Sequence, residues 1–409
     1  MPNFSIALTG LQADSISLNT IGNNLANLNT TAFKKQTTTF QDLFYQNVGT
    51  NGSGNALQIG VGTRVSGTAS SFAQGSLTTT QSATDMAMSG NGFFLVQRGN
   101  TQALTRAGNF ELNSTGNLIT TSGENVMGYG VKNGSVSLNG GIIPLQLPVT
   151  QSETAQTTTN ISLTTSLDAG ASPGKQFSSA IELYDSMGQS HNATVNFIKT
   201  SPTTWNYSVG IPPGDFSGTP VNDVGTLTFD SSGKLTAPAA NVSGISFPGM
   251  KDGASDLTFN FNLYDAASRP TITQTAGTSS TSATTQDGFA AGAYQGFSVD
   301  GDGVVSASFS NGRTTKVGQV AVAMVANTDG LTRAGGNDYA ATDASGGISV
   351  GVANAGGRGA IEGDALEQSN VDISAEFSDL IVAQRAFEAN SKTVTTFDSV
   401  TQQAINMIR

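Results

Sequence analysis

The two ends of the chain constrain its fold most, because both carry helical periodicity while the residues between them have the pattern of strands and turns. Near the N-terminus, counting Ser15 and Gly22 as polar steps, apolar residues alternate at four- and three-residue spacing: Phe4, Leu8, Leu11, Leu18 and Leu25. Near the C-terminus, with Gln384 and Ser391 as polar steps, the corresponding residues are Ile373, Phe377, Leu380, Phe387, Val394 and, after a small register shift, Phe397 and Ile408. Heptad spacing of this kind predicts helices that pack on one another in a coiled coil.

The N-terminal helix is a weak helix when considered alone. Gly10 and Gly22 each cost about 1 kcal/mol relative to alanine in a helix interior. Asn23, Asn24 and Asn27 also disfavour a helix, because their side chains compete for backbone hydrogen bonds. We therefore expect the two ends to form their coiled coil only when many copies assemble and cover the remaining apolar faces. The alternative is a stable helical hairpin on the body of one chain, and the residues alone leave both readings open.

The interior of the chain predicts β-strands. Alternation of apolar and polar residues is clearest over 257–263, and the runs at 92–97 and 319–327 are typical of buried strands. Asp185 to Gly188 reads as a hairpin turn, and Trp205 is expected in a β core. These patterns favour a sandwich or barrel of antiparallel strands.

Two polar, low-complexity stretches bracket one of the β blocks. Residues 150–165 read as a linker or a long extended strand, and residues 276–286 read as a second linker. Such bracketing indicates that one domain is inserted in another. The predicted fold is mainly β with terminal α-helices. It comprises a terminal helical domain (1–33 and 366–409), a connecting segment (34–70), a discontinuous middle β domain (71–150 and 286–365) and an outer inserted β domain (151–285).

Composition excludes several classes of partner. Only 11% of residues are charged and the net charge is -11, which argues against binding to nucleic acid or to an anionic membrane. The absence of cysteine rules out disulfides and thiolate metal sites. No apolar run is long enough to span a bilayer, and the N-terminus lacks the pattern of a cleavable signal peptide. If the chain leaves the cell, we expect a route that reads an uncleaved end.

No residue set in the sequence indicates catalysis, so we expect a protein that is not an enzyme, with no catalytic, cofactor-binding or metal-binding residues. The segment that begins at Asp300 starts like a calcium loop, but Val304 and Val305 stand where that loop needs an acidic residue or Asn and then Gly, so a hairpin turn is expected. His191 is the only histidine and is expected at the surface.

Four stretches resemble the bacterial flagellar rod and hook family. Residues 17–34 (SLNTIGNNLANLNTTAFK) and 369–394 (SNVDISAEFSDLIVAQRAFEANSKTV) resemble its terminal signatures. Residues 83–96 and 105–130 resemble its central β region, although Leu104 stands where the family usually has Tyr. The signature positions are Gly22, Asn23, Asn24, Ala26, Asn27, Ser369, Asn370, Val371, Asp372, Gln384 and Arg385.

The resemblance implies a self-assembling structural protein. The extra β block at 151–285, together with residues 184–200, favours the hook members over the shorter rod members; a distal rod protein is the alternative, and a secreted β-rich adhesin a weaker one. Hook members form a curved tube that acts as a universal joint. The implied partners are copies of the chain itself, the distal rod protein, the hook–filament junction protein, the hook cap protein and the flagellar type III export apparatus. The implied location is the extracellular hook of the flagellum.

Overall fold

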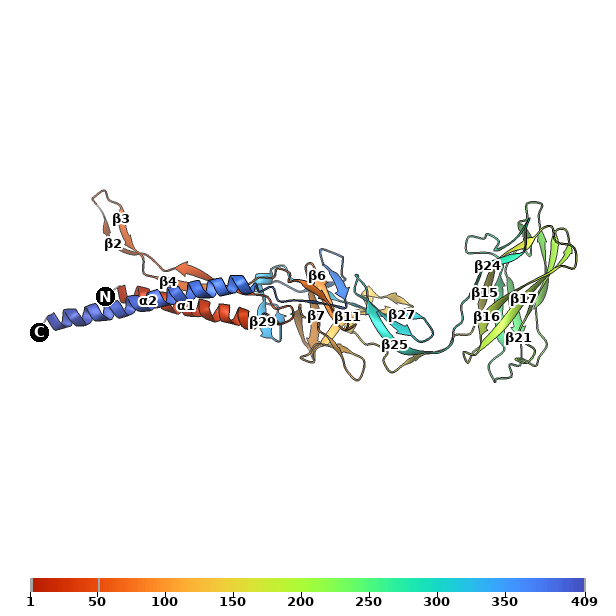
Figure 1. The fold of residues 1–409 in the computed structure, drawn as a ribbon, viewed down its shortest axis with the longest axis horizontal. Helices are drawn as coiled ribbons and strands as arrows, with labels where there is room; N and C mark the ends of the chain where they lie inside the picture. The colour runs from red at the N-terminus through yellow and green to blue at the C-terminus, as the bar shows by residue number, and fades with distance from the viewer. Residues whose placement is uncertain (1–2, 51, 408–409) are drawn as a thin grey trace. The chain divides into compact units, whose positions relative to one another are not determined.

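The computed structural model describes residues 3–50 and 52–407 and divides them into two compact units (Figure 1). The first unit comprises the residues up to Val149, Gly296–Ala307 and the residues from Thr315 onward. The second comprises Thr150–Gln295 and Ser308–Thr314. Strands dominate both units and helices occupy the two ends of the chain, which confirms the predicted fold class.

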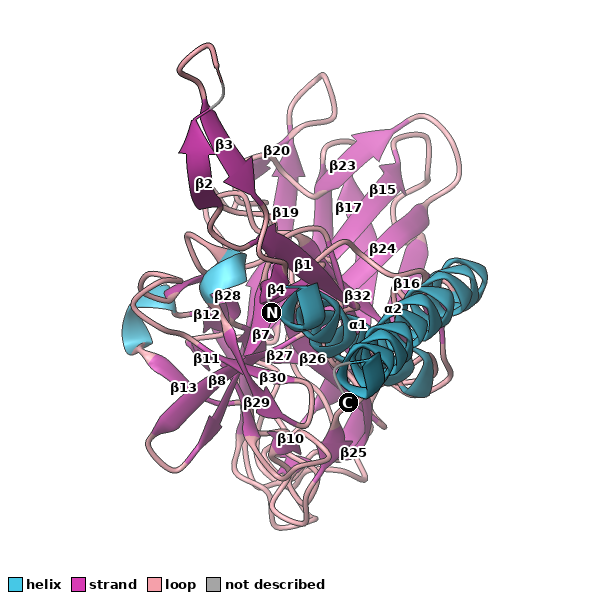
Figure 2. Cartoon of the chain, turned by 90° about the vertical axis from the view of Figure 1, so that its left-hand side faces the viewer, coloured by secondary structure: helices cyan, strands magenta, loops and turns pink. Residues whose placement is uncertain are grey.

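The two long helices belong to the first unit and lie side by side (Figure 2). Helix α1 spans Asn3–Ala26 and α2 spans Ile373–Met407. Helix α1 ends where Asn27 begins to bond locally, donating from Nδ2 to the carbonyl of Asn23 at 2.9 Å. Helix α2 begins after Asp372, whose Oδ1 accepts from the N–H groups of Ser374 and Ala375 as an N-cap. No described helix has the length and apolar character needed to cross a membrane.

The segment after α1, predicted as the connecting segment 34–70, contains four strands. Strand β1 (Gln36–Asp42) pairs with β4 (Thr63–Ser70), and β2 (Gln46–Thr50) pairs with β3 (Ala56–Ile59). Thr63 and Gly62 contact Thr9, so this segment packs against α1.

A large sheet and two smaller strand pairs form the β part that follows. The strands are β5 (Leu77–Thr79), β6 (Met86–Ser89), β7 (Phe93–Arg98), β8 (Thr101–Thr105), β9 (Glu111–Leu112), β10 (Leu118–Ile119), β11 (Asn125–Lys132), β12 (Ser135–Val136), β13 (Ile142–Pro144), β14 (Ser152–Glu153), β25 (Gly292–Val299), β26 (Val304–Phe309), β27 (Thr314–Val320), β28 (Val322–Met324), β29 (Thr332–Gly335), β30 (Asp338–Ala340), β31 (Ser349–Gly351), β32 (Ala360–Gly363) and β33 (Ala365–Glu367). Strand β7 is central and lies between β11 and β8, with Phe94 and Val96 in its core. The predicted hairpin turn at Asp300 is confirmed, because Gly303 N–H donates to the Asp300 carbonyl at 2.8 Å between β25 and β26.

The second unit holds β14 and parts of β25, β26 and β27, together with a two-sheet sandwich. One sheet holds β16 (Gln176–Tyr184), β17 (Ser190–Ser201), β18 (Thr204–Gly210), β19 (Val224–Phe229) and β20 (Leu235–Ala237). The other holds β15 (Asn160–Asp168), β21 (Val242–Phe247), β22 (Leu257–Asn262), β23 (Ile272–Thr275) and β24 (Ser280–Gln286). Trp205 lies in the core, as predicted, and the alternation from Leu257 to Leu263 is buried on one face.

Three expectations for this unit were wrong. Strand β15 pairs in parallel with both β22 and β23, so the sandwich is not wholly antiparallel. Residues 280–286 are not a linker but the strand β24, which pairs with β15; its three Thr residues are β-branched and favour strands. His191 is 5% exposed rather than at the surface, because carboxylates surround its ring. Burial lowers the pKa of His191, but hydrogen bonds to Asp215 and Asp185 outweigh this and raise the pKa overall.

Candidate assembly site at the terminal helices

Within the chain, α1 and α2 meet through small and polar side chains. A Cβ on Gly10 would lie 2.7 Å from Nδ2 of Asn390, so the glycine allows a close approach of the two helices. The same Nδ2 donates to Oδ2 of Asp14 at 2.9 Å. Asn24 on α1 contacts Glu376 on α2, two heptads after Gly10 and two heptads before Asn390.

Four of the ten predicted coiled-coil residues whose side chains the structure describes are exposed in the single chain, and the other six are half-buried. Leu8 is 43% exposed, Phe377 52% and Phe387 38%. Ile373 is exposed as well, and the half-buried members are Leu11, Leu18, Leu25, Leu380, Val394 and Phe397. Phe4 belongs to α1, but its side chain lies outside the described residues, as does all of Ile408.

Other large apolar side chains on these elements are also exposed. On the helices they are Ile16, Ile381, Val382, Val400, Ile405 and Met407. In the segment after α1 they are Phe40, Phe44, Tyr45, Val48, Leu57 and Ile59, and Phe44 is 91% exposed. Strands β2 and β3 form a two-stranded sheet, a structure that is marginal in water without further packing. Exposed apolar surface on this scale marks a protein–protein contact site.

One buried asparagine ties the helices to the strand that follows α1. Asn24 is 1% exposed, and its Nδ2 donates to the Gln36 carbonyl at 2.8 Å and to Glu376 Oε2 at 3.1 Å. Its Oδ1 accepts from the Gln36 N–H at 2.9 Å. Lys35 Nζ lies 3.5 Å from Glu376 Oε1 and partly compensates that carboxylate. All polar atoms of the amide are thus used to fix α1 against β1 and α2.

A buried ion pair lies where both ends of the chain leave the β part of the first unit. Lys34 Nζ lies 2.7 Å from Glu367 Oε1 and donates to the Ala73 carbonyl at 2.9 Å. Arg106 Nη1 lies 3.6 Å from Glu367 Oε2. Burial lowers the pKa of Lys34, even though the hydrogen bond and charge of Glu367 act to raise it. Burial likewise lowers the pKa of Arg106, against the charge of Glu367.

Asn370 completes this junction, where both chain ends leave the β part of the first unit, through its amide and its backbone. Its Oδ1 accepts from the Lys35 N–H at 2.7 Å, and its Nδ2 donates to the carbonyls of Ser71 and Ala73. Its N–H donates to the carbonyl of Phe33 at 3.2 Å. One side chain thus connects the chain leading into α2 with two segments more than 290 residues away.

Four family models match the chain in the order in which its parts occur. They are described as flagella basal body rod protein (residues 4–34), flagellar hook protein FlgE/F/G D1 domain (87–165), flagellar basal body protein FlaE D2 domain (166–289) and flagellar basal body rod FlgEFG protein C-terminal (362–407). Proteins named flagellar hook protein FlgE match over almost the whole length. The one from Borreliella burgdorferi is 31% identical over 98% of each chain, and the one from Escherichia coli is 31% identical over 99% of each.

The chain belongs to the flagellar hook protein family. It is a structural subunit of the bacterial flagellar hook, a self-polymerising part of the flagellum in the basal-body region. The crystal structure of Helicobacter pylori flagellar hook protein FlgE2 has a similar fold, with a TM-score of 0.54 and 16% identity over 71% of this chain and all of that one.

The hook-family signature residues divide into two groups in the structure. The first group makes specific contacts. Asn24 fixes α1 against α2, Asn370 completes the junction, Asn27 follows the end of α1 and Asp372 caps the start of α2. Val371 is buried, and Ser369 accepts weakly from its N–H at 3.4 Å. By contrast, Gly22, Asn23, Ala26, Gln384 and Arg385 are exposed. A Cβ on Gly22 would meet nothing within 4 Å, so the single chain gives no packing reason for glycine there.

Sequence reasoning missed the charged members of the junction. Lys34, Arg106 and Glu376 lie inside stretches that resemble the family but are not among the signature positions, and Glu367 lies just outside them. Arg333, which donates to the Lys34 carbonyl, lies far from both ends in the sequence. The available signal was their rarity: in a chain with only 11% charged residues, a charge beside a terminal signature is a candidate for a specific contact.

Proposed function

We propose that the terminal helices of neighbouring subunits pack through their leucine and phenylalanine rows to form the inner tube of the hook. The observation that carries the proposal is the exposure of Leu8, Phe377 and Phe387 in the single chain. Burial of such side chains contributes about 1.5–3 kcal/mol each, so a tube made of many copies supplies the stabilisation that one chain lacks. In this proposal the ends are held weakly in the monomer and become fully stable on assembly.

The proposed layering follows the division made from the sequence. Residues 1–33 and 366–409 form the inner tube, 34–70 the connecting segment, 71–150 with 286–365 the middle layer, and 151–285 the outer layer. A hook transmits torque while it bends, so its axial contacts must slide. Outer surfaces rich in Ser, Thr, Asn and Gly suit this role, because they exchange hydrogen bonds with water at low net free-energy change.

The proposed partners are those that a hook subunit meets during assembly. They are further copies of the chain, the distal rod protein, the hook–filament junction protein, the hook cap protein and the flagellar type III export apparatus. Export would leave the N-terminus uncleaved. The nearly uncharged first 33 residues, with Asp14 as the only charged side chain, are consistent with passage through a narrow channel in an unfolded form.

Two substitutions test the inner-tube contact. Leu8→Asp and Phe387→Asp place a charge on side chains that are exposed in the single chain, so the monomer should fold normally while polymerisation is lost. Negative-stain microscopy measures tube formation, and Val224→Asp, at an exposed position of β19 in the second unit, is the matched control. Normal tubes from both helix variants would refute the contact.

Hydrogen exchange tests the assembly dependence separately. We expect amides of α1 and α2 to exchange much faster in the monomer than those of β7 and β17, and to become protected in the polymer. Equal protection of helices and β cores in the monomer would show that the ends are stable without neighbours.

A further inference from the structure

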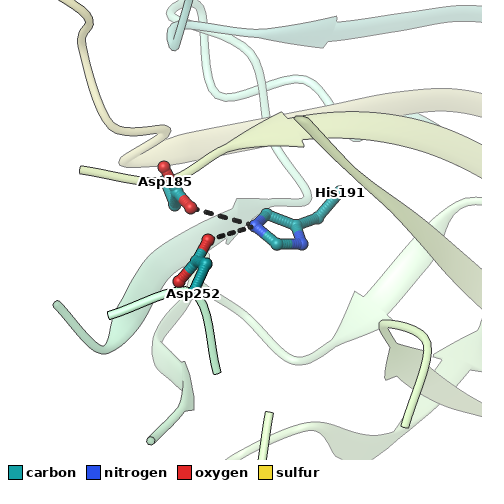
Figure 3. Close-up of side chains that lie close together, drawn as sticks. All are labelled: Asp185, His191 and Asp252. Carbon is teal, nitrogen blue, oxygen red and sulfur yellow. Dashed lines mark hydrogen bonds and ion pairs between the residues drawn. The ribbon is translucent and has the colours of Figure 1, made fainter. Parts of the chain in front are cut away.

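Four titratable side chains converge at one end of the sandwich in the second unit. Asp185 lies in the turn between β16 and β17, and His191 is the second residue of β17. Asp215 comes from the loop after β18, and Asp252 from the loop between β21 and β22. Asp185 is fully buried and His191 is 5% exposed. Figure 3 shows Asp185 and Asp252 both directed toward the same ring nitrogen of His191.

The hydrogen-bond pattern leaves one nitrogen of the histidine directed at two carboxylates. Nδ1 of His191 lies 2.8 Å from Oδ2 of Asp215, which fixes the ring and the proton on Nδ1. Nε2 lies 3.1 Å from Oδ2 of Asp185 and 3.7 Å from Oδ2 of Asp252. Around a tetrahedral ion with bonds of about 2.0–2.2 Å, neighbouring ligand atoms lie roughly 3.3–3.6 Å apart. The two observed separations lie on either side of that range.

The charge balance of this cluster also calls for a cation. Among the described residues, the only ion pairs of Asp185, Asp215 and Asp252 are with His191, so three carboxylates share one imidazole. Oδ1 of Asp185 accepts from the N–H groups of Met187 and Gln189, and Oδ2 pairs with Nε2 of His191, where a bound ion would replace the shared proton. The ligand atoms of Asp185, His191 and Asp252 all lie within 4.8 Å of one another. Carboxylates this close repel unless a proton or a metal ion lies between them.

We infer that Asp185, His191 and Asp252 bind a divalent transition-metal ion, with Zn²⁺ as the best match. One imidazole nitrogen and two carboxylate oxygens suit Zn²⁺, with water as a fourth ligand, whereas Ca²⁺ needs six to eight oxygen ligands. Asp215 is a positioning residue that orients the imidazole through its Nδ1–H. The ion joins the β16–β17 turn, strand β17 and the loop between β21 and β22, and stabilises them against local opening, so its role is structural.

Binding of Zn²⁺ to the full-length monomer tests this site. The protein is treated with EDTA, dialysed and titrated with ZnCl₂ by calorimetry, and Trp205 fluorescence follows thermal unfolding of the second unit. We expect one ion per chain and a rise in the unfolding temperature of that unit. Asp252→Asn should weaken the affinity at least tenfold, and Asp215→Asn about 10- to 100-fold, the loss typical of residues that orient a metal ligand.

Matched variants decide between a built site and incidental binding. Glu182→Gln removes an exposed carboxylate from β16 of the same unit and should leave the affinity unchanged. His191→Gln should abolish binding. Because His191 is buried, this variant can misfold; in that case Asp252→Asn, at a partly exposed position, still tests the site. Absence of binding at 1:1 stoichiometry, or equal affinity in wild type and Asp252→Asn, would overturn the inference.

Discussion

The ion pair between Lys34 and Glu367 is the most deeply buried charged contact that the structure describes, with both side chains fully buried. Glu367 also accepts from the Gly75 N–H at 2.7 Å, so its Oε1 joins three segments of the first unit. Such pairs add little to stability compared with apolar residues of the same shape, but removal of one partner leaves a costly charge. The pair therefore specifies where the two chain ends leave the β part.

We expect Lys34→Met to lower the free energy of unfolding of the first unit by about 3 kcal/mol, because Glu367 would keep a buried charge with only Arg106 to compensate it. Urea denaturation followed by the helical circular dichroism signal measures this. Trp205, the only tryptophan, reports the second unit and should show no change. Lys132→Met, at an exposed position of β11 in the same unit, is the control and should cost less than about 1 kcal/mol. Equal losses in the two variants would contradict the argument.

Asp338 gives the first unit a pH dependence. Burial, together with a hydrogen bond and repulsion from Glu124, raises the pKa of Asp338 to about 7, against smaller opposing effects of Thr105 and Arg98. The folded state therefore holds a proton that the unfolded state releases near pH 4, and stability falls as the pH rises from about 4 to 7. We expect a slope of up to about 1.4 kcal/mol per pH unit in the unfolding free energy. Asp338→Asn should flatten it, and an unchanged slope in that variant would exclude Asp338 as the source.

At the scale of elements, strands and helices were predictable where burial is periodic. The alternation of Leu257, Phe259, Phe261 and Leu263 predicts β22 and its buried face because one side of a sandwich sheet faces the core. The heptad rows likewise predict α1 and α2. Turn chemistry predicts the ends of strands, since the Asp300 carboxylate accepts from the N–H groups of Asp302 and Val304.

The wrong predictions concern places where polar side chains or the backbone, rather than apolar side chains, form the contacts. Strand β24 has no apolar face. It pairs with β15 through backbone hydrogen bonds, which leave no pattern in the side chains. The contact between α1 and α2 uses Gly10 and Asn390, which an apolar pattern cannot select. His191 was missed because its three aspartates are separated by up to 67 residues and only the fold brings them together. Polar contacts between distant segments produce no periodic pattern in the sequence around each residue.

At the scale of the whole molecule, the chain crosses between its two units four times, at 149/150, 295/296, 307/308 and 314/315. The sequence predicted a linker or a long extended strand at 150–165 and a linker at 276–286. Residues 280–286 are instead a paired strand and 160–165 belong to β15, so flexibility of the hook requires another source. Contacts between outer units of neighbouring subunits are that source in our proposal. Charged side chains make up only 11% of the chain, so few locked ion pairs oppose sliding.

Removal of the outer sandwich separates tube formation from bending. Gln156 and Phe289 exchange backbone hydrogen bonds at 3.0 and 2.9 Å, so residues 157–288 can be replaced by Asn-Gly, a two-residue hairpin turn. We expect this variant to polymerise, because the helices that form the inner tube are intact, but to give straighter and stiffer tubes without the sliding outer contacts. Electron microscopy of tube curvature and persistence length measures the change, with the Glu182→Gln chain as the control. Truncated tubes with the curvature and stiffness of the full-length polymer would place the compliance in the inner layers instead.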